Sequence, residues 1–225
     1  MLCAPSKKKS AKKLDGGRKK RRLSHDGDEE SENGEGDANT FNSRVLMSLQ
    51  PLLLCLEFAL RADGQDGGKW VRADENQRYR ALLEPLGKML ACKVPEDFPV
   101  SVEMENDVSP FHHVVRGDDS GCGNVVGCLT ALAGAAGNEQ LWKPLNFAVL
   151  DACGSGRSEV RKAGLSCLLS LMKSLGEEYM VLLPECLPVL SERLEDNDEE
   201  VTGLAQDCIA LGEDLLGESL EDSLR

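Results

Sequence analysis

Aromatic residues are scarce in this chain of 225 residues, where five Phe, two Trp and two Tyr make up 4% of the sequence. Large β-sandwiches and barrels depend on aromatic and β-branched side chains, so the shortage favours helices. Histidine is also rare, with three in the chain, which leaves few candidates for general acid–base catalysis. The most apolar stretch, residues 45–60, is interrupted by Gln50, Pro51 and Glu57 and is too short to span a bilayer. The basic N-terminus runs into acids instead of the apolar segment of a signal peptide, so we expect a soluble intracellular protein without a membrane partner.

The pattern of a reaction centre is also missing. No glycine-rich loop precedes a phosphate-binding lysine, and the Gly-x-Gly pairs lack the third glycine of a dinucleotide-binding loop. His112 and His113, with Cys122 and Cys128, are the only set that resembles a metal site. Adjacent histidines rarely face the same ion, and the spacing of the two cysteines is not a usual zinc spacing. We expect no enzyme activity, no cofactor and no small-molecule substrate, with a zinc-dependent enzyme or zinc module as an alternative.

Cysteine, in contrast, is plentiful. The nine cysteines are odd in number and irregularly spaced, which argues against a disulfide framework and for a reducing compartment. Within an apolar helix pattern a free thiol behaves as a small hydrophobic side chain. We therefore expect buried thiols at four positions on or beside such patterns: Cys153, Cys167, Cys186 and Cys208.

The net charge of −13 is distributed unevenly along the chain. Residues 1–23 carry +9, residues 24–37 carry −7 and the remainder carries −15, so a uniformly basic nucleic-acid binder is excluded. Residues 1–42 contain almost nothing that could be buried, which predicts a disordered tail, basic and then acidic. Two basic clusters in this tail resemble a nuclear localisation signal and are candidate RNA contacts: Lys7, Lys8, Lys9, Lys12, Lys13, Arg18, Lys19, Lys20, Arg21 and Arg22.

Two helical patterns follow in residues 43–94, which we interpret as a helical pair. Apolar residues recur at steps of three and four over residues 45–60 and 76–91, and each of these stretches contains one proline. Residues 95–123 contain three prolines and a glycine cluster, which predicts a loop insertion.

Residues 124–225 contain an internal repeat. Superposing Val160 on Val201 aligns the apolar and small residues of 160–175 with those of 201–216, a period of 41 residues. Each unit is predicted to contain a shorter helix, an acidic or Gly/Ser turn and a longer helix. This length and pattern are typical of HEAT or armadillo repeats.

Cap residues and acids mark the end of the repeat region. Gly176 and Gly217 are expected to end the two longer helices, and Asp196 with Glu199 is expected to cap the start of the last one. From residue 177 onward there are 15 acids and two bases. An acidic face keeps a terminal repeat soluble, and it can also bind basic protein segments. We expect the interaction surface at Glu195, Asp196, Asp198, Glu199 and Glu200.

Several longer stretches are more specific than the repeat pattern. They are residues 138–146 (NEQLWKPLN), 175–184 (LGEEYMVLLP), 194–201 (LEDNDEEV) and 215–224 (LLGESLEDSL), with a less specific match at 79–86 (YRALLEPL). Over residues 124–225 the chain resembles the C-terminal domain of the family of U3 small nucleolar RNA-associated protein 10, also called HEAT repeat-containing protein 1. The resemblance implies an all-α fold of HEAT-like helical hairpin repeats, the terminus of an α-solenoid, without catalytic residues.

The resemblance also implies a function. The family supplies scaffold subunits of the small-subunit processome, which support pre-18S rRNA processing and are linked to polymerase I transcription. We therefore expect a non-catalytic scaffold in the nucleus and nucleolus, with other processome proteins as partners. Because the folded part is acidic, contact with U3 small nucleolar RNA or the 5′ external transcribed spacer is expected to be indirect or through the tail. The alternative is a HEAT- or armadillo-type nuclear adaptor that binds basic cargo on its acidic surface.

Overall fold

The computed structural model describes residues 35–91, 114–116 and 123–220, with residues 35–48 as backbone only. All regular secondary structure in these ranges is helical. The α-helices are α1 (Glu35–Gln65), α2 (Ala73–Leu90), α4 (Val125–Ala136), α5 (Glu139–Cys153), α6 (Ser158–Leu175), α7 (Leu183–Leu194) and α8 (Glu199–Leu216), and η1 (Gly176–Leu182) is a 3₁₀-helix. This confirms the predicted all-α fold. In these ranges no helix combines the length and the apolarity needed to cross a bilayer.

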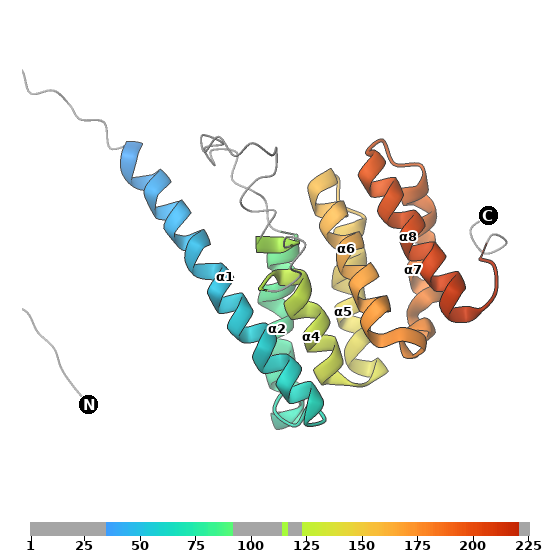
Figure 1. Cartoon of the computed structure of the whole chain (residues 1–225), viewed down its shortest axis with the longest axis horizontal. Coiled ribbons are helices and arrows are strands. Elements are labelled where there is room, and N and C mark those ends of the chain that lie inside the picture. Colours follow the sequence, from blue (N-terminus) through green and yellow to red (C-terminus); the bar gives the residue numbers. More distant parts are fainter. Residues whose placement is uncertain (1–34, 92–113, 117–122, 221–225) are drawn as a thin grey trace, which may run out of the picture. The chain divides into compact units, whose positions relative to one another are not determined.

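The helices form two layers (Figure 1). In one layer α1, α4, α6 and α8 pack side by side, and α2, α5 and α7 lie in the other. Successive helices alternate between the layers, so that α5 with α6 and α7 with α8 are helical hairpins. The described helices therefore form the predicted HEAT-like stack of hairpins.

The 41-residue period is confirmed at the helix ends. Helices α6 and α8 both have 18 residues, and their first residues, Ser158 and Glu199, are 41 positions apart. Helices α5 and α7 end at Cys153 and Leu194, again 41 positions apart. The last two hairpins therefore repeat in structure as they do in sequence.

The predicted caps are confirmed at the C-terminal ends and wrong at one N-terminal end. Gly176 and Gly217 follow α6 and α8 with φ of 58° and 72°, a backbone conformation that favours glycine. The N-cap of α8, however, is Asp198, whose side chain accepts a hydrogen bond from the backbone N–H of Glu200 at 3.0 Å. Asp196 lies two residues before this cap, where its carboxylate accepts a hydrogen bond from the backbone N–H of Asp198 at 3.1 Å and binds two arginines, described below.

The first two helices differ in detail from the pattern in residues 43–94. Helix α1 begins at Glu35 and continues through Pro51 without ending there. Helix α2 includes Asp74, Glu75 and Asn76, all with positive φ, so regular right-handed helix begins only after Asn76. Apolar periodicity correctly placed that regular part.

Buried aromatic side chains hold α5 against its neighbours. The hydroxyl of Tyr79 on α2 donates to the Leu141 carbonyl at 2.5 Å, and the indole N–H of Trp142 donates to a carbonyl of α4 at 2.9 Å. The hydroxyl of Tyr179 donates to Asn146 Oδ1 at 2.5 Å. Every one of these buried polar atoms thus has a partner, which fixes α5 against three neighbouring elements.

Candidate protein-interaction surfaces

The turns within the last two hairpins lie at the same edge of the stack (Figure 1). We call the charged residues gathered there the turn edge. It comprises Arg116, Glu159, Arg161, Lys162, Arg193, Asp196, Asp198 and Glu200.

Asp196 is the most enclosed acid of the turn edge, with 4% of its side chain exposed. Its carboxylate lies 2.7 Å from Arg161 Nη2 on α6 and 3.3 Å from Arg193 Nη1 on α7. The hydrogen bond from Arg161 is the main reason why the pKa of Asp196 lies below its usual value. One carboxylate therefore joins the two hairpins.

Lys162 is the second centre of the turn edge. Its Nζ lies 2.9 Å from Asp198, 3.1 Å from Glu200 and 3.3 Å from Glu159, and Arg116 Nη1 lies 2.6 Å from Glu200. The hydrogen bond from Lys162 lowers the pKa of Asp198. Burial acts to raise the pKa of Glu200, but hydrogen bonds from Arg116 and Lys162 outweigh it, and that pKa is lowered too.

These contacts divide the predicted acidic surface into two groups. Asp196, Asp198 and Glu200 have intramolecular cation partners. Glu195 and Glu199 are exposed, and neither forms an ion pair within the part of the chain that the structure describes. Most of the cluster's charge thus contributes to contacts between repeats, and docking of basic segments stays a prediction.

Other predicted positions lie wholly or partly outside the described residues. The ten basic residues between positions 7 and 22 do so, as do His112, His113 and Cys122 of the zinc alternative. Cys128 is buried, its Sγ lies 3.2 Å from the Leu53 carbonyl, and burial raises its pKa to about 12. Over the described ranges, no group of three His, Cys, Asp or Glu side chains is arranged to hold a metal ion.

The four predicted core thiols are confirmed as buried: Cys153, Cys167, Cys186 and Cys208. Burial raises the pKa of the last three to about 12 and raises that of Cys153 well above its usual value. Thiols with such pKa values are protonated at neutral pH and are poor nucleophiles. Their position supports packing and gives no nucleophilic site.

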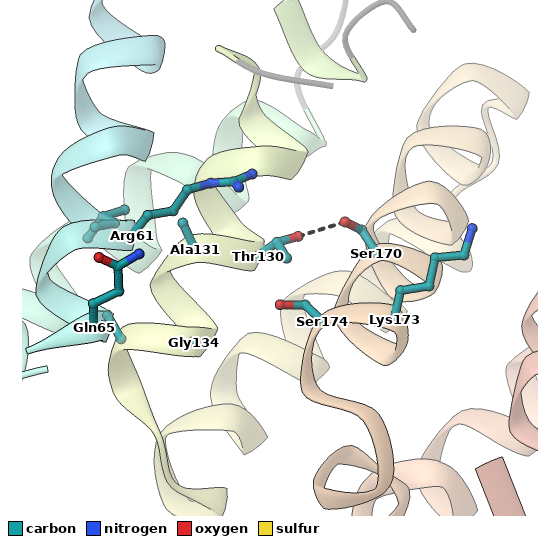
Figure 2. A pocket seen from close by; sticks show the side chains of 11 residues that line it. Arg61, Gln65, Thr130, Ala131, Gly134, Ser170, Lys173 and Ser174 are labelled. Carbon is teal, nitrogen blue, oxygen red and sulfur yellow. Dashed lines mark hydrogen bonds between the residues drawn. The ribbon is translucent and has the colours of Figure 1, made fainter. Parts of the chain in front are cut away.

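A groove of about 580 Å³ lies between α1, α4 and α6, and no sequence pattern predicts it (Figure 2). Its lining contains no acid and consists of Leu60, Arg61, Gly64 and Gln65 of α1, Thr130, Ala131, Gly134 and Ala135 of α4, and Ser170, Lys173 and Ser174 of α6. In the sequence nothing distinguishes these residues from the other residues of their helices. Only the packing of three helices in one layer brings them together, and no local pattern signals that.

A buried carboxylate pairs with Arg61 of the groove. Glu57 is 1% exposed, and its Oε1 lies 2.6 Å from Arg61 Nη2. Its Oε2 accepts a hydrogen bond from the backbone N–H of Gly123 at 2.7 Å. A Cβ at Gly127 would lie 2.5 Å from the same oxygen, so glycine is needed there to admit the carboxylate. Glu57 thus connects α1 to the start of α4 and positions Arg61.

Known proteins similar to this chain are much longer than it. No protein-family model matches. An uncharacterised protein of Arabidopsis thaliana is 35% identical over 150 residues, which are 67% of this chain and 6% of that protein. HEAT repeat-containing protein 1 of Homo sapiens is 39% identical over 98 residues, 44% of this chain and 5% of that protein. U3 small nucleolar RNA-associated protein 10 of Chaetomium globosum is 32% identical over 163 residues, 68% of this chain and 9% of that protein.

Fold and similarity agree. The described helices form HEAT-like hairpins, and two of these three relatives carry names of the family that residues 124–225 resemble. The chain spans 9% or less of each of them. It therefore carries a domain that matches the C-terminal domain of the family of HEAT repeat-containing protein 1 and U3 small nucleolar RNA-associated protein 10.

Proposed function

We propose that the chain is a non-catalytic scaffold component in ribosome biogenesis, within the small-subunit processome that supports pre-18S rRNA processing. The observation that carries this proposal is the 32% identity, across 68% of the chain, to a protein named for its association with U3 small nucleolar RNA. Stacked hairpins support a scaffold because they present extended surfaces to protein partners. A role in polymerase I transcription belongs to the same proposal.

Its partners, in this proposal, are other processome proteins. The described domain is acidic, so contact with U3 small nucleolar RNA or the 5′ external transcribed spacer of pre-rRNA is indirect or is made by the basic residues 7–22. The same basic residues direct the chain to the nucleus, and its site of action is the nucleolus. Within the predicted acidic surface, Glu195 and Glu199 are the exposed acids without an ion pair in the described residues and would bind basic protein segments. They would also serve the alternative, a nuclear adaptor for basic cargo.

The test is a pull-down of the endogenous protein tagged at its C-terminus, with the bound RNA quantified for U3 and 5′ spacer sequences. We expect both to be enriched over the RNA bound to an unrelated nucleolar protein. A second tagged version, with the ten bases between positions 7 and 22 changed to Gln, should lose nuclear accumulation. Absence of U3 and spacer enrichment from the unmodified protein would overturn the processome proposal and favour the adaptor.

A further inference from the structure

We propose that the groove between α1, α4 and α6 binds a peptide segment with Glu or Asp side chains, contributed by a partner protein. The proposal does not depend on the processome function. The described domain is acidic overall, yet this groove is lined by two cations, Arg61 and Lys173, and by no carboxylate. Its charge is therefore complementary to an acidic segment and opposite to that of the predicted acidic surface.

Neither cation is fully neutralised. The Arg61 side chain is 53% exposed, and Glu57 is its only acid partner in the part of the chain that the structure describes. An arginine has five N–H donors, so most of them remain for a ligand carboxylate. Lys173 is exposed and has no ion pair within the described ranges. Figure 2 shows Arg61 extending from α1 over α4, whereas the Lys173 side chain extends from α6 away from Arg61. The four-carbon stem of lysine is flexible, so its ammonium can turn toward a ligand in the groove.

The floor of the groove admits a peptide backbone. Gly134 is exposed in the last turn of α4, and a Cβ added there would have no atom within 4 Å. Packing within the domain therefore gives no reason for glycine at this position, although glycine weakens a helix relative to alanine. Ala131 and Ala135 continue the shallow floor.

Polar groups for a peptide backbone lie along the same floor. The Thr130 and Ser170 hydroxyl oxygens lie 3.0 Å apart and join α4 to α6, as the dashed line in Figure 2 shows. Ser174 of α6 and Gln65 of α1 also line the groove and are exposed. Hydroxyl and amide groups both donate and accept hydrogen bonds, as the N–H and C=O groups of an extended segment require.

Protein fits this groove better than RNA does. No aromatic side chain lines it, so bases have nothing to stack on. A long polyanion would also meet the acidic surface elsewhere on the domain, whereas a short peptide would not.

The test uses the full chain and a fluorescein-labelled peptide of twelve residues, with four Glu among Gly, Ser and Ala, followed by fluorescence anisotropy. We expect saturable binding that weakens as NaCl is added and is about tenfold weaker when Gln replaces each Glu. Lys173→Glu should weaken binding by about tenfold or more. Arg80→Glu is the matched control, because Arg80 is exposed on α2 and lies outside the groove. This substitution changes the net charge by the same amount as Lys173→Glu. Binding that is equal for both peptides, or equally weakened by both variants, would overturn the proposal.

A second pair of variants separates groove filling from charge. Gly134→Leu should fill the groove and abolish binding, while Gly203→Leu on α8 should not, because a Cβ at Gly203 likewise meets no atom within 4 Å and lies outside the groove. Thermal melting of both variants shows whether they fold. If Gly134→Leu does not fold, the Lys173→Glu comparison decides. A twelve-nucleotide single-stranded RNA that binds more tightly than the Glu peptide, and loses binding with Lys173→Glu, would overturn the peptide in favour of nucleic acid.

Discussion

The turn edge and the groove both contain basic side chains, and they differ in what lies opposite them. At the turn edge, Arg161, Lys162 and Arg193 each lie within 3.3 Å of an acid in the turn that precedes α8. In the groove, Arg61 shares one buried carboxylate, and Lys173 forms no ion pair within the described ranges. The same residue types thus connect repeats in one region and remain accessible in the other.

One domain can thus keep the residues that stabilise it apart from those that bind a ligand. A partly buried ion pair is costly to break, because the remaining charge stays away from water without a partner. An exposed cation contributes little to stability but contributes to affinity once a ligand covers it. Substitutions at the turn edge should therefore change the free energy of unfolding, and substitutions in the groove should change peptide affinity.

Asp196→Ala should have the largest effect. It leaves the Arg161 and Arg193 side chains, 12% and 17% exposed, without their shared carboxylate, and we expect the free energy of unfolding to fall by about 3 kcal/mol. Urea denaturation followed by circular dichroism measures this. Glu195→Ala is the control, since Glu195 is exposed and should change stability by less than about 0.5 kcal/mol. Equal effects of the two variants would contradict the role given to Asp196.

Glu57→Ala should affect both regions at once. It removes the acceptor of the buried Gly123 N–H, which should cost about 2 kcal/mol of unfolding free energy, and Glu57→Gln, which keeps an acceptor, should cost less. Both variants also release Arg61 from its acid partner, so the Glu peptide should bind more tightly. Anisotropy and urea denaturation on the same samples measure the two effects. Weaker peptide binding by a folded Glu57→Gln protein would show that Glu57 positions Arg61 more than it neutralises it.

Local patterns in the sequence predicted what depends on neighbouring residues. The helices, the 41-residue period and the glycine caps follow from spacing within a few turns of helix. The predicted cap of α8 is wrong by two residues, and the partner of Asp196 that the sequence does not indicate is Arg161, 35 residues before it. The groove depends on contacts among α1, α4 and α6, which are distant in the sequence. In the sequence Glu57 only interrupts an apolar helix, and its role becomes clear from its contacts with Gly123 and Gly127 in the structure. Such distant contacts leave no local periodicity to detect.

Acid should weaken the turn edge. The pKa values of Asp196, Asp198 and Glu200 are lowered in the folded chain, so these groups bind protons more readily when the chain is unfolded. Their stabilising contribution is present above the ordinary carboxyl pKa of about 4 and is lost as the pH falls through the lowered values. Urea denaturation of the unmodified chain and of Asp196→Asn from pH 7 to pH 3 measures this. The stability difference between the two should narrow as the pH falls, and a constant difference would contradict the prediction.

Gly134→Ala should have the smallest effect on stability and the opposite sign. Alanine fits at this position without a contact within 4 Å and favours the helix, so the free energy of unfolding should rise by about 0.5–1 kcal/mol. Gly203→Ala should give a similar gain for the same reason. Only Gly134→Ala places a methyl group on the groove floor, so only it should weaken binding of the Glu peptide in the anisotropy assay. Stabilisation by both variants with weaker binding for one alone would show that the glycine of α4 serves the ligand at a cost to the helix. Equal affinity in both would mean that the peptide does not approach the floor, and that any binding rests on the two cations of the rim.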